Sequence, residues 1–415
     1  MIKKIYNRIM DRALYKNSFY LMINTGVLAI SGFVFWLLVA RVYTPHEIGI
    51  ATTLFSAILM ISGISIFGLN AGLLRYIPKS KSFHKRFNSS IILVSVWGSI
   101  LSGIYLAILP LISHDLTFIR SNSFFIVSFI LFTIISTISE LLESVFLALK
   151  KTPYILQKNG IFSILKLVLP FLFISLGAYG IISSIFISSA FAVFIGFILL
   201  YKETSYRFHP QFSAKDISDM ATYSFGSFIS AQMSNLPLYL LPIIITAKLS
   251  VIQTAYYFIA ASIASFLYVI PKIVTQNLLV EGSHDEKNVK SHILHSGIII
   301  FSLFIPLAFG IIFFGQYILS LFGKNYSQEG FMLLRLLTVS SFFACFNAVF
   351  GTIYAIKKQV KLLILANTTY SAILLLYAFY FLPNGLITIG YASIIAQIVV
   401  LIVNSGIITY KKYYV

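Results

Sequence analysis

The sequence predicts an all-α integral membrane protein with twelve transmembrane helices, and three observations support this prediction. Of its 415 residues, 59% are hydrophobic and only 10% are charged, whereas a soluble protein carries about a quarter charged residues. The apolar residues form twelve runs, each near the length of about 20 residues that crosses a bilayer. Features of the first six runs recur in the last six, which indicates two six-helix lobes.

The twelve predicted spans are joined by short polar connections. Before them, residues 1–16 place apolar side chains on one helical face with Lys and Arg between them, which predicts an amphipathic helix at the cytoplasmic interface. The expected spans are 18–40, 48–74, 89–112, 123–149, 155–177, 179–201, 219–247, 253–280, 291–314, 328–356, 361–382 and 385–409.

The basic residues of the connections predict the orientation of the chain. With the N-terminus inside, 24 of the 30 Lys and Arg residues fall on the inner side, among them Lys150, Lys151 and Lys158. The four that fall outside are Arg41, Arg120, Lys248 and Lys324. Because cytoplasmic loops are enriched in Lys and Arg, both termini are expected to be cytoplasmic.

An internal repeat predicts the domain organisation. Several similar residues recur 207 positions apart: Arg41 and Lys248, Asn70 and Asn277, Lys150-Lys151 and Lys357-Lys358. Six spans per repeat give both halves the same orientation, so the halves are expected to be related by a pseudo-two-fold axis along the membrane normal. The prediction is an N-terminal lobe over 1–201, a cytoplasmic linker over 202–218 and a C-terminal lobe over 219–415.

Several kinds of site are excluded by composition and motifs. The net charge of +18 is scattered in short clusters between apolar runs, rather than gathered on the basic face that nucleic-acid binding needs. No Cys/His cluster has metal-ligand spacing, and the single Cys345 excludes a disulfide framework. No Walker motif is present, so the chain is not expected to hydrolyse ATP. We expect no cofactor, and H+ or Na+ is the candidate coupling ion.

Three ionisable residues inside spans are candidate functional groups, because each costs about 3 kcal/mol or more unless it faces a cavity or a partner. Lys166 either forms part of a cationic cavity that binds a phosphate or pairs with Glu140 or Glu143. These two glutamates are three residues apart and share one helical face. They either take up a proton or cation during transport or balance the basic residues Lys150, Lys151 and Lys158.

Three further basic residues are candidates for the same cationic cavity. Arg41 and Lys248 end their spans on the outer side, where they either face the substrate or extend to the interface as anchors. Arg75 ends a span on the cytoplasmic side, where it either meets an anionic headgroup or anchors the inner leaflet.

Amide side chains are expected to line the cavity. In the seventh span, Gln232 and Asn235 precede Pro237 and Pro242, and prolines free backbone carbonyls that membranes tolerate only beside protein or water. A cavity wall and simple kinked packing both explain this pattern. The candidate lining residues are Asn24, Asn70, Gln232, Asn235 and Asn277.

Three segments resemble Wzx-type polysaccharide flippases of the multidrug/oligosaccharidyl-lipid/polysaccharide (MOP) exporter superfamily. They are residues 32–49 (GFVFWLLVARVYTPHEIG), 67–78 (FGLNAGLLRYIP) and 318–326 (ILSLFGKNY). The resemblance also extends to chain length, span number and the two-lobe plan. It implies a MATE-like fold, with V-shaped lobes around a cationic central cavity and alternating access.

The resemblance also implies a function in polysaccharide biosynthesis. The substrate would be an undecaprenyl-pyrophosphate-linked oligosaccharide, moved to the periplasmic leaflet of the bacterial inner membrane for O-antigen (lipopolysaccharide), capsule or exopolysaccharide. A polysaccharide polymerase and a chain-length regulator would be partners. A multidrug antiporter of the same superfamily is the alternative, although it would favour acidic cavity residues. A membrane polymerase or acyltransferase would need larger outer loops than this chain has, so we expect a transporter rather than an enzyme.

Overall fold

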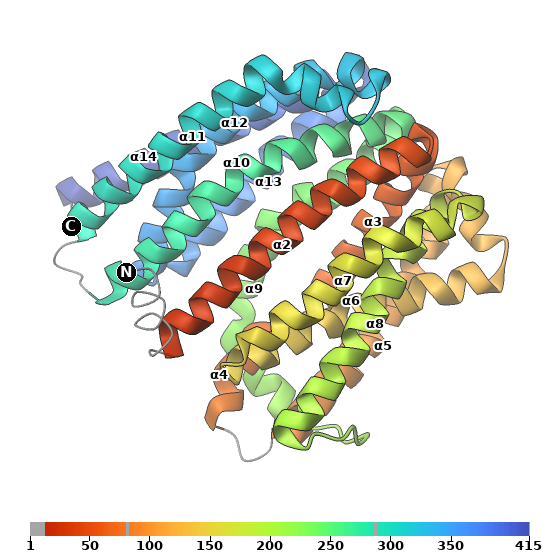
Figure 1. The fold of residues 1–415 in the computed structure, drawn as a ribbon. Coiled ribbons are helices and arrows are strands. Elements are labelled where there is room, and N and C mark those ends of the chain that lie inside the picture. The colour runs from red at the N-terminus through yellow and green to blue at the C-terminus, as the bar shows by residue number, and fades with distance from the viewer. Residues whose placement is uncertain (1–12, 80–82, 285–288, 415) are drawn as a thin grey trace, which may run out of the picture. The chain divides into compact units, whose positions relative to one another are not determined.

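The computed structural model describes residues 13–79, 83–284 and 289–414, and within these ranges it contains helices and no strand. Most of the expected amphipathic helix over 1–16 lies outside the described residues. The helices, drawn in Figure 1, are α2 (Ala13–Val42), α3 (Pro45–Ser65), α4 (Leu69–Tyr76), η1 (Ile77–Lys79), α5 (Phe83–Ile112), η2 (His114–Arg120), α6 (Ser123–Ala148), α7 (Thr152–Leu172), η3 (Ile174–Leu176), α8 (Ala178–Thr204), α9 (Ala214–Lys248), α10 (Val251–His284), α11 (Val289–Ser320), α12 (Lys324–Ile356), α13 (Val360–Phe381), η5 (Leu382–Asn384) and α14 (Ile387–Tyr414).

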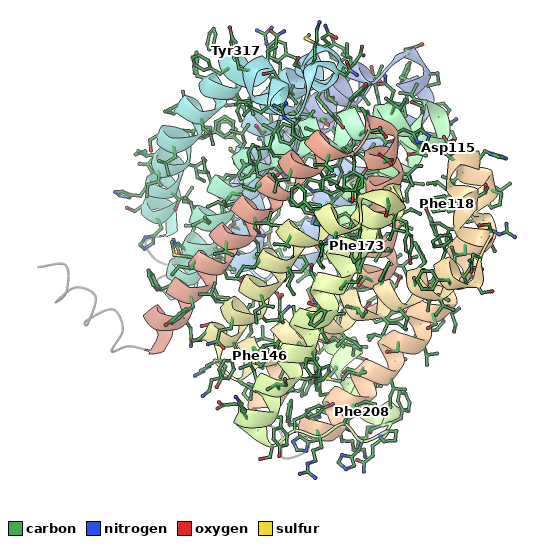
Figure 2. All side chains as sticks on the ribbon, turned by 45° about the vertical axis from the view of Figure 1, so that its right-hand side comes forward. Asp115, Phe118, Phe146, Phe173, Phe208 and Tyr317 are labelled. Atoms are coloured by element: carbon green, nitrogen blue, oxygen red, sulfur yellow. The ribbon has the colours of Figure 1, made fainter. Side chains whose placement is uncertain are left out.

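Twelve of the described helices are long and apolar enough to cross a membrane. This confirms the predicted all-α membrane fold and its number of spans. Side chains project from all of these helices, as Figure 2 shows. In the same view, Phe118 of η2 and Phe208, which follows α8, mark opposite ends of the group formed by α2 and α5 to α8.

The corner between α2 and α3 explains the turn in the segment 32–49. The backbone N–H of Thr44 donates to the carboxylate of Glu47 at 2.8 Å, and the N–H of Glu47 donates to the Thr44 hydroxyl at 3.3 Å. This reciprocal arrangement is a capping box. Pro45 occupies the first helical position of α3, where its missing N–H removes no helical bond. The sequence TPHE therefore ends one span and starts the next within a few residues.

The same helix ending occurs at two corners 208 residues apart. Lys150 is left-handed (φ 58°), and the N–H of the next residue donates to the carbonyl of Phe146 at 2.8 Å. Lys358 is also left-handed (φ 55°), and the N–H of the next residue donates to the carbonyl of Tyr354 at 2.8 Å. Both are Schellman endings, followed by α7 and α13 respectively. The repeated doubled lysines thus mark repeated backbone geometry.

The described chain separates into two compact units. Unit 1 combines the residues up to Tyr43 with Ala57–Phe225, and unit 2 combines Thr44–Ser56 with the residues from Gly226 onward. Helices α3 and α9 each contribute residues to both units. The segment 202–218, which we expected to be a linker, belongs to unit 1 in this division.

Within unit 2, the first half of α3 is tightly packed against α10. A Cβ atom added at Gly49 would overlap the backbone carbonyl of Val251. Beside this contact, the hydroxyl of Thr53 is 2.6 Å from that of Thr246, which is 2.7 Å from that of Thr254. Only glycine allows such a close approach of two helices, so residues 44–56 are a structural part of unit 2.

Candidate functional site

The polar face of α7 forms the centre of the candidate site in unit 1. Asn159, Ser163, Lys166 and Pro170 are spaced by four, three and four residues, which places them on one side of the helix. This side faces α2, and the two helices lie next to each other (Figure 1).

Hydrogen bonds join this face of α7 to α2 along most of its length. The side-chain amide of Asn159 donates to the Asn24 oxygen at 2.9 Å. Further along, the hydroxyl of Ser31 donates to that of Ser163 at 2.9 Å. The phenol of Tyr43 donates to the carbonyl of Pro170 at 2.7 Å. Polar contacts therefore join α2, or the residue just after it, to α7 at three levels, although both helices are candidate membrane spans.

Lys166 lies within this seam and has no counter-ion among the described residues. Its side chain is only 6% exposed, and its ammonium nitrogen lies 4.7 Å from the centre of the Phe162 ring. Among the described residues, no carboxylate forms an ion pair with it, so the alternative of pairing with Glu140 or Glu143 is not observed. The Phe162 ring is the contact of this ammonium that the described residues provide, and binding of a phosphate there stays a prediction.

Lys158 lies inside α7, and its assignment to the connection before α7 was wrong. It is 1% exposed, and its ammonium donates to the Ser139 hydroxyl at 2.7 Å and pairs with Glu143 at 2.9 Å. Because α7 begins at Thr152, residue 158 is about 9 Å inside the helix at 1.5 Å per residue. Lys150 and Lys151 come just before α7, and the orientation prediction groups Lys158 with these two residues.

The two glutamates of α6 have different partners. Glu143 pairs with Lys158 and also accepts from the side-chain amide of Asn159 at 3.1 Å. Glu140, one turn earlier, accepts a hydrogen bond from the Asn70 amide at 3.1 Å and forms no ion pair within the described chain. Within the described residues, the predicted acidic pair therefore consists of one carboxylate paired with a lysine and one hydrogen-bonded to an amide.

Asn159 is a member of this network that sequence reasoning missed. It bonds to both Asn24 and Glu143, and thus links α2, α6 and α7. The signal that could have found it is the internal repeat, because Asn367 occupies the equivalent position 208 residues later.

Unit 2 has the same polar seam without the charges. Asn367 on α13 donates to the Ser230 hydroxyl on α9 at 3.1 Å. Ser371, four residues later, donates to the carbonyl of Met233, the acceptor that Pro237 leaves without a helical partner. The position equivalent to Lys166 is Leu374, which is 1% exposed. The repeat therefore keeps the seam in both units and places a cation only in the first.

The other amide candidates have less defined surroundings. Helix α9 continues through Pro237 and Pro242 without a break, with Gln232 and Asn235 half-buried on it. Asn277 is exposed on α10. Their role as cavity-lining residues stays a prediction.

Arg41 and Lys248 lie in the last turns of α2 and α9. Both are exposed, and a cation in the last helical turn is favoured by the helix dipole. The ammonium of Lys248 also lies 3.9 Å from the centre of the Phe379 ring. The equivalent location of the two residues is clear, and their contact with a substrate stays a prediction.

Comparison with known proteins assigns the chain to a family. The family described as "Polysaccharide biosynthesis protein" matches residues 14–276, well over half of the sequence. The chain belongs to this polysaccharide biosynthesis family. A comparison with curated protein sequences gives no match.

Solved structures confirm that this polysaccharide biosynthesis protein has the expected MATE-like fold. The lipid II flippase MurJ, in an inward closed conformation, is similar with a TM-score of 0.75 and 17% identity over 94% of this chain and 87% of that one. An inward-facing multidrug resistance MATE family transporter of the MOP superfamily gives 0.70 and 14% over 94% and 96%. Its outward-facing counterpart gives 0.64 and 16% over 94% and 93%. At these identities, the likeness shows the fold alone.

At the start of α7, the polysaccharide biosynthesis protein has an ion pair between Lys151, just before the span, and Glu203 near the end of α8. The ammonium of Lys151 lies 2.6 Å from the carboxylate of Glu203. This hydrogen bond raises the pKa of Lys151. The phenol of Tyr154 donates to the same carboxylate at 3.2 Å, so the start of α7 is fixed to the end of α8.

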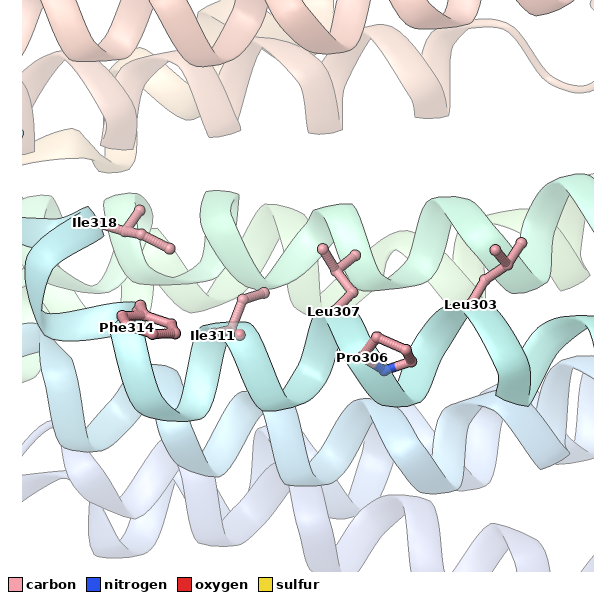
Figure 3. Close-up of a pocket in the computed structure, with 7 residues that line it drawn as sticks. Leu303, Pro306, Leu307, Ile311, Phe314 and Ile318 are labelled. Carbon is pink, nitrogen blue, oxygen red and sulfur yellow. The ribbon is translucent and has the colours of Figure 1, made fainter.

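The polysaccharide biosynthesis protein also has an apolar groove on α11, drawn in Figure 3. Its volume is ≈ 490 Å³, and its lining residues repeat along one side of a single helix: Leu303, Pro306, Leu307, Gly310, Ile311, Phe314 and Ile318. Without a charge or hydroxyl, this groove offers nothing to a phosphate or a sugar. Within the described residues, no group of His, Cys, Asp and Glu side chains could hold a metal ion.

Proposed function

We propose that the protein is a flippase that moves an undecaprenyl-pyrophosphate-linked oligosaccharide from the cytoplasmic to the periplasmic leaflet by alternating access. Membership of a polysaccharide biosynthesis family supports a role in making a polysaccharide. The fold shared with a lipid II flippase supports movement of a lipid-linked sugar. The proposed products are O-antigen, capsule or exopolysaccharide, as for the Wzx-type flippases that the sequence resembles.

The observation that carries this proposal is the unpaired cation at Lys166. A pyrophosphate cannot cross about 30 Å of hydrocarbon unaided, because an isolated charge there costs several kcal/mol. Lys166 is buried in the seam between two spans and lacks a carboxylate partner in the described chain. A passing phosphate would supply the missing counter-ion, and the uncharged amides and hydroxyls beside it suit a sugar.

Coupling to a proton or Na+ gradient is proposed at Glu140. Glu143 already has the ammonium of Lys158 at 2.9 Å, so it gains little from a further cation. Among the described residues, Glu140 has the amide of Asn70 as its hydrogen-bond partner and no cation, so it would take up a cation or a proton. Exchange at this carboxylate would let a gradient drive the conformational cycle.

We also propose the cellular setting. The chain would lie in the bacterial inner membrane with both termini cytoplasmic, since the Lys and Arg residues gather on that side. A polysaccharide polymerase and a chain-length regulator would act on the delivered units. Reporter fusions to the two termini test the orientation, and an external signal from either would contradict it.

The function is tested in a deletion strain with inside-out and right-side-out membrane vesicles. Lipid-linked oligosaccharide should accumulate on the cytoplasmic leaflet when the gene is absent and return to the outer leaflet when it is restored. No accumulation would refute the flippase proposal. Increased drug sensitivity of the deletion strain, with normal polysaccharide, would instead favour the multidrug antiporter.

A further inference from the structure

Helix α4 presents an exposed arginine at its end. Two left-handed residues, Phe67 (φ 48°) and Gly68 (φ 76°), precede this helix and change the chain direction after α3. Leu69 and Leu73 are buried in the core of unit 1, and this fixes the orientation of the helix. Arg75 lies on the exposed side of its last turn.

The side chain of Arg75 is held against an aromatic ring. Its guanidinium carbon lies 3.8 Å from the centre of the Tyr223 ring on α9 and 5.9 Å from that of Tyr76. The two helices are closely packed, because a Cβ atom added at Gly72 would lie 2.6 Å from the Cβ of Met220. A guanidinium stacked on a ring keeps its N–H groups free in the plane, so Arg75 is oriented while its donors stay available.

Arg86, a second arginine nearby, differs from Arg75 because it has a carboxylate partner. Arg86 lies 5.0 Å from the Tyr76 ring, and its Nε is 3.0 Å from the carboxylate of Asp216. Within the described part of the chain, Arg75 forms no such ion pair. Asp219, one turn before the stacked tyrosine, is exposed and does not pair with Arg75. Arg86 therefore has a carboxylate partner, and Arg75 has none among the described residues.

The location of α4 indicates which anion this is. In the chain, α4 lies between the spans Pro45–Ser65 and Phe83–Ile112, at the membrane boundary on the side predicted to be cytoplasmic. Leu74, next to Arg75, is 46% exposed, as suits a residue beside lipid chains. A cation at this depth meets the phosphates of lipid headgroups.

We propose that Arg75, oriented by Tyr223, is a binding site for the phosphate of a lipid headgroup. Guanidinium N–H groups form paired hydrogen bonds to two phosphate oxygens, and the stacked geometry removes part of the entropy cost of ordering the side chain. The phosphate would come either from the polyprenyl-linked substrate or from a bulk phospholipid. Only the first source rests on the proposed flippase function.

Binding of polyprenyl monophosphate to the purified full-length protein in detergent tests the site, with neutral polyprenol as the reference ligand. R75Q should weaken monophosphate binding about tenfold or more, the loss expected for one charge-assisted contact, and should leave polyprenol binding unchanged. R86Q changes the net charge equally and should have no such effect. Y223F should bind as wild type, whereas Y223L should bind more weakly.

Equal losses in R75Q and R86Q would mean that only overall charge matters, and would overturn the proposal. Unchanged binding in R75Q would also overturn it. If R75Q fails to fold, R75K and Y223L decide, since both should weaken binding and wild-type affinity in both would refute the site.

Phosphatidylglycerol as competitor separates the sources of the phosphate. Equal competition assigns the site to lipid headgroups in general, and weak competition assigns it to the polyprenyl carrier. Because this assay measures binding, a failed transport test would leave its result standing.

Discussion

Replacing Lys166 by leucine should stabilise the protein and strongly reduce the proposed transport. The variant removes a buried cation that has no counter-ion within the described residues. Leu374 occupies the equivalent position in unit 2 and is 1% exposed, so leucine fits on this helical face. A lysine within a span costs about 3 kcal/mol, whereas a leucine is slightly favourable. K166L should therefore raise the free energy of unfolding by about 3 kcal/mol.

Two measurements check this prediction. A gain of about 3 kcal/mol should raise the thermal unfolding midpoint of the purified protein by about 6 °C or more for a unit of this size. Export of polysaccharide in the deletion strain should fall about tenfold or more, because the phosphate loses a charged partner. The reverse variant, L374K, is the matched control and should lower the midpoint by a similar amount.

Either of two results would refute the reasoning. A lower midpoint in K166L would show that the ammonium has a stabilising partner. Unchanged export would show that the cation takes no part in carrying the substrate.

Three further predictions concern packing and ion pairs. Gly49→Ala should destabilise the protein by several kcal/mol, because the added methyl overlaps a carbonyl of α10. The thermal midpoint and the yield of folded protein should both fall. Lys158→Ala should destabilise by about 2 kcal/mol, less than for a fully buried pair, because the Glu143 side chain is 35% exposed. Glu203→Gln should change stability by less than about 0.5 kcal/mol, because the Lys151 side chain is 41% exposed. Since Glu203 raises the pKa of Lys151, this small contribution is present at neutral pH and is lost as the pH rises through the pKa of the paired lysine.

Each of these predictions has a control. Gly103→Ala adds a methyl where nothing lies within 4 Å and should leave folding unchanged; a loss equal to that of Gly49→Ala would refute the packing argument. The double variant K158M/E143L should recover most of the stability lost in Lys158→Ala, and no recovery would contradict the unpaired-charge explanation. A clear loss of stability in Glu203→Gln between about pH 6 and pH 9 would show that this surface pair is stronger than surface pairs usually are.

The fold was predictable because lipid-facing helices must be apolar for their whole length, so composition alone marks them. Helix ends were less predictable. Helix α5 begins at Phe83, six residues before the expected span, because residues 83–88 contain no glycine or proline to stop a helix. Helix α9 begins at Ala214 rather than 219 for the same reason. Polar residues end a span but do not end a helix.

The site was predictable only where a charge interrupts an apolar run. Lys166 stands out for this reason, and its lack of a partner could be learned only from the structure. Lys158 and Asn159 follow a doubled lysine. The charge count therefore places Lys158 in the connection, although the expected span 155–177 already contains it. The different partners of Glu140 and Glu143 depend on side chains from α4 and α7, which no spacing within α6 reveals.

Residues 44–56 come early in the chain but belong to unit 2, and this has a consequence for biogenesis. These residues leave the ribosome about 200 positions before Thr246 and Val251, the partners against which Thr53 and Gly49 pack. During synthesis, half of α3 must therefore wait in the membrane for helices not yet made, and such distant contacts form slowly. Separate expression of the halves on either side of residue 218 would leave unit 2 without this segment. The C-terminal half of the chain thus needs this N-terminal segment to complete unit 2.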